Sequence, residues 1–232
     1  MAVFFYIQAI PLLFMKFINI HTHHKPKKAG EIVIRNVFIH RQHKMPSVAY
    51  GMSVGLHPWY VNDIEMDACI NKLAEWISNP SIFAVGEIGI DRSIDTSIEI
   101  QRKFFEAQLN IARAFQKPVI IHAVKSYSDL LPYVKKAHIP FIFHQFQGNL
   151  QQAHDLIKHG AFLSFGKNLF QPLIENVFIK IPIESCFFET DTANHINISD
   201  IYRKAAELKK IDIDSLMKFQ NDTFVAVFNK QI

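Results

Sequence analysis

Residues 82–122 have the sequence IFAVGEIGIDRSIDTSIEIQRKFFEAQLNIARAFQKPVIIH, in which two apolar runs flank an amphipathic segment. The runs IFAVGE (82–87) and PVIIH (118–122) are short and apolar, which is typical of buried strands. Between them, residues 97–116 place apolar side chains at helical spacing. A strand, a helix and a second strand in this order predict a βα unit with parallel strands.

The same alternation continues in both directions along the chain. Six further runs predict strands: KFINI (16–20), EIVIRNVFI (31–39), YGMSVGL (50–56), PFIFH (140–144), AFLSF (161–165) and SCFFE (185–189). Further helices are predicted over residues 63–78, 127–137, 149–159, 198–209 and 213–228, whereas 21–30 and 40–49 are too short for helices. Eight strands alternating with helices predict an α/β fold, a single-domain (β/α)₈ TIM barrel. An open doubly wound sheet is the alternative, but no G-x-G-x-x-G or P-loop motif follows any strand.

The first residues of the chain stand apart from this pattern. MAVFFYIQAIPLLFM lacks the basic start and the cleavage site of a secretory signal, and Gln8 and Pro11 interrupt it as a membrane span. We therefore expect the barrel to comprise residues 15–232, with 1–14 as an extension or a misassigned start. We also expect a cytoplasmic protein that does not associate with a membrane. Cys69 and Cys186 form no CxxC motif and are predicted to be buried thiols.

Polar residues occur where the predicted strands end. His21 and His23 follow the first strand, His57 follows the third, Glu87, His122 and His144 end the fourth, fifth and sixth, and Asp191 comes just after the eighth. In a barrel these strand ends lie on one face, where active sites form. His21 and His23 are two residues apart and face the same way, with Thr22 facing the opposite way.

Imidazole nitrogens and carboxylate oxygens together suit zinc and related ions. The sequence therefore predicts a metal site formed by His21, His23, Glu87, His122, His144 and Asp191. A divalent ion acidifies a water molecule and polarises the bond under attack. Glu87 is expected to bridge two ions through its two oxygens. Asp191 is expected to bind metal and to accept a proton from the attacking water, so these two acids are the candidate catalytic residues.

Several motifs in a fixed order resemble the TatD family of metal-dependent deoxyribonucleases, in the metallo-dependent hydrolase superfamily. They are INIHTH, SVGLHPW, AVGEIGID, QRKFFEAQL, KPVIIHA, FIFHQFQG and FETD, and they cover nearly the whole chain from Met15. The resemblance implies two divalent ions, with Mg, Mn and Zn all open. His21, His23, Glu87 and Asp191 would hold the first ion, and Glu87, His122 and His144 the second. It also implies that His57 lies near the substrate and that the substrate is DNA or another phosphodiester. We expect the protein to be a monomer.

Two positions depart from the pattern of that family. Asn19 stands where relatives usually have an acid before the first histidine, so the support of that histidine is expected to differ. Val124 stands where an arginine usually follows the fifth strand, and valine offers no donor to a phosphate oxygen. Lys125 is adjacent and is the candidate substrate-binding residue in its place. We therefore expect a weaker or differently directed nuclease.

Three functions remain open at this stage. The first is metal-assisted hydrolysis of a phosphodiester. The second is hydrolysis of a small amide, ester or lactone by the same site, which the missing arginine favours. The third is a metal-binding scaffold with little turnover. The net charge of +4 is compatible with an anionic substrate but does not require one.

Overall fold

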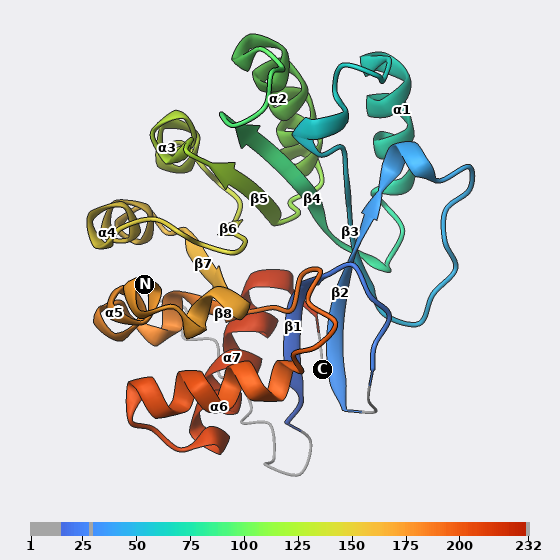
Figure 1. Ribbon diagram of the computed structural model, residues 1–232. Coiled ribbons are helices and arrows are strands. Elements are labelled where there is room, and N and C mark those ends of the chain that lie inside the picture. Colours follow the sequence, from blue (N-terminus) through green and yellow to red (C-terminus); the bar gives the residue numbers. More distant parts are fainter. Residues whose placement is uncertain (1–14, 28–29, 231–232) are drawn as a thin grey trace, which may run out of the picture.

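The computed structural model describes residues 15–27 and 30–230, and its eight strands form one sheet (Figure 1). All neighbouring strands are parallel, and their order in the sheet is their order in the chain. The strands are β1 (Phe17–Thr22), β2 (Glu31–Phe38), β3 (Gly51–Gly55), β4 (Ile82–Asp91), β5 (Val119–Val124), β6 (Phe141–Phe143), β7 (Phe162–Phe165) and β8 (Cys186–Phe188).

The first and last strands meet at their C-terminal ends. Thr22 forms a parallel bridge with Asp191. The backbone N–H of Asp191 donates to the carbonyl oxygen of His21 at 3.0 Å, and the N–H of His23 donates to that of Asp191 at 3.1 Å. These hydrogen bonds close the ring, so the predicted barrel is confirmed and the open doubly wound sheet is wrong.

Seven α-helices are present among the described residues. They are α1 (Met66–Trp76), α2 (Ile98–Ala114), α3 (Tyr127–Lys135), α4 (Leu150–Lys158), α5 (Pro172–Lys180), α6 (Ile198–Lys209) and α7 (Ile213–Phe228). All the predicted helices are found, and α5 is one that the sequence analysis missed. Its residues PLIENVFIK include several strand formers, yet Ile174, Val177 and Phe178 at helical spacing are buried.

The described residues of the segments 21–30 and 40–49 contain no α-helix, as expected. The link from β2 to β3 begins with a 3₁₀ turn, η2 (Ile39–Arg41), and a second 3₁₀ turn, η3 (Pro58–Tyr60), follows β3. The predicted extension 1–14 lies outside the described residues. Within the described part of the chain, no helix combines the length and the hydropathy needed to cross a bilayer.

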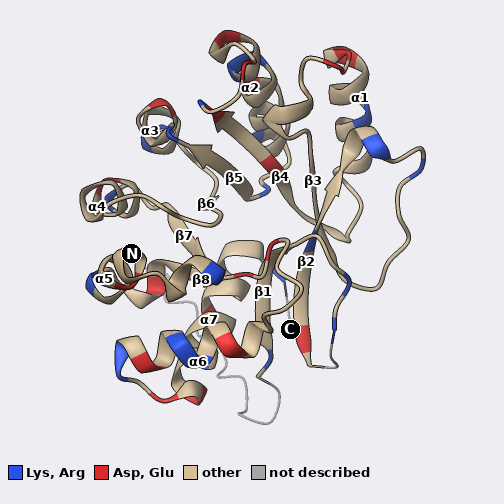
Figure 2. Ribbon diagram, viewed as in Figure 1, with Lys and Arg blue, Asp and Glu red and all other residues tan. Residues whose placement is uncertain are grey.

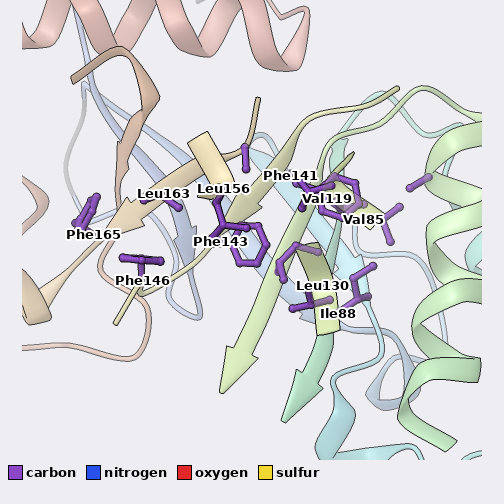
Figure 3. Packing of buried hydrophobic residues seen from close by; sticks show 14 of the residues in the cluster. Val85, Ile88, Val119, Leu130, Phe141, Phe143, Phe146, Leu156, Leu163 and Phe165 are labelled. Atoms are coloured by element: carbon purple, nitrogen blue, oxygen red, sulfur yellow. The ribbon is translucent and has the colours of Figure 1, made fainter. Parts of the chain in front are cut away.

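Alternate residues of the strands contribute to two apolar layers. Between the strands and the surrounding helices, Val85 and Val119 pack with residues such as Leu130 and Leu156 (Figure 3). A separate inner cluster contains Ile18, Ile20, Ile34, Ala84, Ile120, Ile142, Phe187, Phe224 and Phe228. Because Phe224 and Phe228 belong to α7, this helix packs against the inner residues of the strands. Cys69 and Cys186 are buried free thiols, as predicted.

Candidate metal centre

Glu87 on β4 lies between the imidazoles of three histidines from other strands. Its Oε1 atom is 2.7 Å from His122 Nδ1 and 2.7 Å from His144 Nε2. Its Oε2 atom is 3.4 Å from His21 Nε2. The side chains of all four residues are at most 10% exposed. The two oxygens of Glu87 therefore face two different sets of nitrogen atoms, as a bridging carboxylate requires.

Asp191 extends the cluster beyond His21. Its Oδ1 atom is 3.5 Å from His21 Nε2 and 3.3 Å from His23 Nε2. The backbone of Asp191 has a φ of 48°, a left-handed conformation that is uncommon for residues other than glycine. The hydrogen bonds to β1 that close the barrel hold this conformation. The structure thus brings together all six predicted ligands: His21, His23, Glu87, His122, His144 and Asp191.

Glycines in the motif AVGEIGID allow β4 to lie against β5 beside the cluster. A Cβ atom on Gly89 would stand 2.0 Å from the carbonyl oxygen of His122, and a Cβ on Gly86 would stand 2.8 Å from Ile120 Cβ. Gly89 also has a φ of 155°, which side-chain-bearing residues rarely adopt. These two glycines therefore permit the close strand approach that places Glu87 next to His122.

The buried atoms of His21 support metal binding. Neither Nδ1 nor Nε2 of His21 has a hydrogen-bond partner in the described structure, although the residue is fully buried. Burial lowers the pKa of His21, but the carboxylates of Asp191 and Glu87 raise it more, to about 9. Burial raises the pKa of Glu87, but His144, His122 and His21 lower it well below its usual range. Buried imidazole nitrogens that form no hydrogen bond and face carboxylates at a distance form a donor set that fits a divalent cation.

Two further acids hold the distal nitrogens of the cluster histidines. His122 Nε2 lies 3.0 Å from Asp91 Oδ2, and His144 Nδ1 lies 3.3 Å from Glu189 Oε1. Both carboxylates are buried. A carboxylate in this position orients a ligating imidazole and increases its basicity. Neither acid was predicted from the sequence as a partner of a metal ligand, although Asp91 lies in the motif AVGEIGID and Glu189 in FETD.

Asn19 has a different role from the usual acid at its position. Its Nδ2 donates to Thr190 Oγ1 at 2.9 Å, and its Oδ1 accepts from the Thr190 N–H at 3.0 Å. Asn19 therefore ties β1 to the segment after β8, and it does not pair with His21. The expectation that support of the first histidine differs is consistent with this geometry.

His57 lies inside the cluster, with Nε2 3.2 Å from Glu87 Oε1 and 3.1 Å from His122 Nδ1. Its Nδ1 accepts a hydrogen bond from the backbone N–H of Trp59 at 3.2 Å. Burial lowers the pKa of His57, and Glu87 offsets this only in part. A neutral imidazole that accepts at Nδ1 carries its proton on Nε2. In this arrangement Nε2 faces Glu87 Oε1 as a donor, although His57, Glu87 and His122 also form a group whose donor atoms lie close enough to hold a metal ion.

A cavity of about 590 Å³ opens beside the cluster and is lined by His122, His144 and Asp191. Lys125 and Lys167 also line it, from the segments after β5 and β7. Both lysines are exposed, and among the described residues neither forms an ion pair with a carboxylate. Lys125 has a φ of 52°, so the chain turns directly after β5 and the lysine reaches the cavity. Sequence analysis did not single out Lys167, which has no distinguishing motif.

Val124 lines the same cavity as the two lysines. Basic and acidic residues are otherwise mixed over the outer helices (Figure 2). The unpaired positive charge of the cavity is therefore a local feature of the metal centre and does not continue a basic surface.

Comparisons with known proteins agree with this geometry. The chain is 29% identical over 147 residues to the uncharacterized metal-dependent hydrolase YjjV of Escherichia coli. This match covers 60% of this chain and 56% of that protein. It is 29% identical over 150 residues to the human 3'-5' RNA nuclease TATDN2, which covers 59% of this chain and 19% of that protein. The chain spans less than two thirds of the length of YjjV and of several other metal-dependent hydrolases that it matches.

The fold has close counterparts among solved structures. The crystal structure of the TatD homologue YjjV from Escherichia coli superposes with a TM-score of 0.79 at 21% sequence identity. The match covers 94% of this chain and all of that chain. The family model for TatD related DNase matches residues 39–229, which include most of the barrel and four of the six clustered residues. The chain therefore belongs to the TatD related DNase family.

Proposed function

We propose that this protein is a divalent-metal-dependent hydrolase that cleaves phosphodiester bonds in DNA or a related nucleic acid. The observation that carries the proposal is the cluster around Glu87. Neither buried nitrogen of His21 has a hydrogen-bond partner in the described structure, and the carboxylates of Glu87 and Asp191 lie 3.4 and 3.5 Å from its Nε2. Such a cluster is unfavourable for folding alone, because buried polar atoms without partners reduce stability. A bound cation offsets this loss.

The donor set divides into two groups that share Glu87. His21, His23 and Asp191 would hold one ion with Glu87 Oε2, and His122 and His144 would hold a second with Oε1. Mg, Mn and Zn are all candidates, and the histidine content favours zinc over magnesium. Bound ions would acidify water and neutralise charge on the phosphate.

Residues of this chain supply the remaining parts of the reaction. Asp191, whose pKa its histidine neighbours hold below the usual range, is ionised and accepts the proton of the attacking water. His57 donates from Nε2 to a substrate oxygen, because the Trp59 N–H occupies its Nδ1. Lys125 and Lys167 attract the negatively charged substrate into the cavity.

The same cavity also supports a second candidate, hydrolysis of a small amide, ester or lactone. Val124 offers no hydrogen bond, and the uncharged side chains of Gln145, Gln147 and Gln152 line the wall with it. Such a lining suits a neutral carbonyl substrate. The two unpaired lysines favour the phosphodiester. We further propose that the protein acts as a cytoplasmic monomer.

A screen of activity after metal loading tests the proposal. The protein is depleted of metal, reloaded with magnesium, manganese or zinc, and assayed on a single-stranded oligonucleotide, a phosphomonoester and an amide. The proposal is supported if the protein hydrolyses the oligonucleotide and Glu87→Gln abolishes this activity. The control variant Glu184→Gln, at the opposite end of the barrel, should retain it. Hydrolysis of the amide alone would replace it with the second candidate.

A further inference from the structure

Trp59 is the largest of the hydrophobic side chains that are exposed in the described structure. It is 56% exposed, whereas the second tryptophan, Trp76, is 6% exposed in the outer core. Trp59 lies in η3, directly after the cluster residue His57 and Pro58. A large apolar ring at the edge of a polar site has no role in the hydrophobic core.

The indole of Trp59 is held in one orientation. Its Nε1–H donates to Asp91 Oδ2 at 2.8 Å, and its backbone N–H donates to His57 Nδ1 at 3.2 Å. The ring packs edge-on against His57 at a centroid distance of 4.8 Å and lies 6.2 Å from the ring of His122. Tryptophan is a large apolar side chain that usually buries most of its ring area in a core or an interface. Here the N–H is bonded to a buried carboxylate and the ring faces solvent, which suits a ring that contacts a ligand.

Other aromatic rings extend this side of the site. Phe38 at the end of β2 lies 5.2 Å from the ring of His23 and 5.6 Å from that of Tyr60. The guanidinium of Arg41 stands 5.0 Å from the centre of Phe38 and 4.9 Å from that of Tyr60. We call Phe38, Trp59 and Tyr60 the aromatic rim. Aromatic rings with a neighbouring arginine are typical of surfaces that bind single-stranded nucleic acids.

The aromatic rim and the lysine-lined cavity lie on different sides of the metal centre. The rim follows β2 and β3, whereas Lys125 and Lys167 follow β5 and β7, on the other side of the ring of strands (Figure 1). A phosphodiester at the cluster has a backbone that continues on both sides. One side of the mouth therefore offers positive charge to phosphate, and the other offers ring faces to a base.

We propose that Trp59 is the stacking surface for the nucleobase next to the scissile phosphate. This inference rests on the phosphodiesterase function proposed above. The centroid of the indole is 6.2 Å from that of the His122 ring. A base stacked on the indole would therefore belong to a nucleotide that is joined to the phosphate at the cluster. In a duplex both faces of that base are covered by its neighbours, so it must be unstacked before it can contact Trp59.

Fluorescence gives the first test, because the protein has only two tryptophans. Binding of a phosphorothioate oligonucleotide, which resists cleavage, is expected to quench the emission of Trp59. The quenching should persist in Trp76→Phe and disappear in Trp59→Phe. Binding is measured independently by the fluorescence anisotropy of a labelled oligonucleotide. If the oligonucleotide binds without quenching the emission of Trp59, the proposal is overturned.

The second test removes the Trp59 side chain and the nucleobase, first separately and then together. It distinguishes stacking of the base on Trp59 from the hydrogen bond between Trp59 and Asp91. Cleavage is compared for a normal oligonucleotide and for one that is abasic beside the scissile phosphate. Trp59→Ala is expected to lower kcat/KM on the normal oligonucleotide about five- to a hundredfold more than on the abasic one, since one base stacked on an aromatic ring contributes that much. Trp59→Phe keeps a ring but loses the Asp91 contact, and should retain most of the preference for the base. Phe115→Ala, a control at an exposed ring on the end of α2, should preserve the full preference.

The outcomes distinguish failure of this inference from failure of the proposed function. Equal losses on both oligonucleotides in Trp59→Ala would mean that Trp59 acts only through Asp91, and the stacking role would be wrong while the nuclease remained. Absence of any binding or cleavage of oligonucleotides by the unmodified protein, with turnover of an amide, would refute both.

Discussion

The two ends of the barrel strands differ in chemistry although they belong to the same strands. On β5, Ile120 belongs to the inner apolar cluster, and His122, two residues later on the same face, belongs to the metal centre. On β6 the corresponding pair is Ile142 and His144. Along one face of a strand, a step of two residues therefore leads from packing to chemistry.

The segment that begins with β8 has the same arrangement. Phe187 belongs to the inner cluster, and Glu189 lies 3.3 Å from His144. The apolar end is closely packed, with α7 contributing Phe224 and Phe228, whereas the polar end holds the unpaired atoms of His21. Packing at the apolar end therefore stabilises a polar end that would not be stable by itself. Mutations at the two ends should therefore have separable effects.

The largest effect is expected at the polar end. Asp191→Asn should lower turnover about 10²- to 10⁴-fold, because an amide does not accept the proton of the attacking water. Rates are measured beside metal content and thermal midpoint. Unchanged turnover in a fully loaded variant would refute the role assigned to Asp191. Asp155→Asn, on α4 and away from the cluster, is the matched control.

The second effect is expected at the apolar end. Phe187→Ala removes a fully buried ring and should lower the free energy of unfolding by about 3–5 kcal/mol. Chemical denaturation measures this loss. Leu173→Ala, at a side chain that is 81% exposed, should change it by at most about 0.5 kcal/mol. If Phe187→Ala instead lost its metal while remaining equally stable, the separation of the two ends would be wrong.

Removal of metal gives the third prediction. A chelator should lower the stability of the unmodified protein by about 2.7 kcal/mol relative to protein with free metal at a hundred times its Kd. The same decrease should occur in Phe187→Ala, because that residue lies in the inner cluster away from the ligands. It should be smaller in Asp191→Asn. Equal decreases in all three proteins would place the stabilising metal elsewhere.

The smallest effect concerns the lysine-lined cavity. Lys167→Gln should reduce kcat/KM on an oligonucleotide about tenfold, because one charge-assisted contact to phosphate is lost. The reduction should shrink as salt rises, since added ions screen the exposed charge. Lys158→Gln makes the same charge change at the end of α4 and should have no effect. A loss that is independent of salt would contradict an electrostatic role.

Sequence periodicity predicted most of the fold because each strand has a buried, apolar pattern of its own. The exception, α5, has residues such as Ile174, Val177 and Phe178 that also suit a strand, and only their packing in the outer core distinguishes the two structures.

The candidate ligands were predictable for a similar reason. Each follows or ends a strand, and the C-terminal ends of the strands in a barrel lie on one face regardless of the detailed packing. Local sequence therefore determined that His21, His122 and His144 come together. It did not determine their partners, because Asp91 and Glu189 reach those histidines across strands whose relative register is set by the closed barrel.

By itself, the sequence determined the barrel, the family and the polar character of one end of its strands, since these depend on residue order and periodicity. Only the tertiary structure decided the hydrogen bond to His57 Nδ1, the position of Lys167 and the exposure of Trp59. Each of these depends on atoms that are distant in the chain or on solvent access around a turn. A hydrogen bond such as that from Trp59 to Asp91 forms only when the connection after β3 packs against the end of β4.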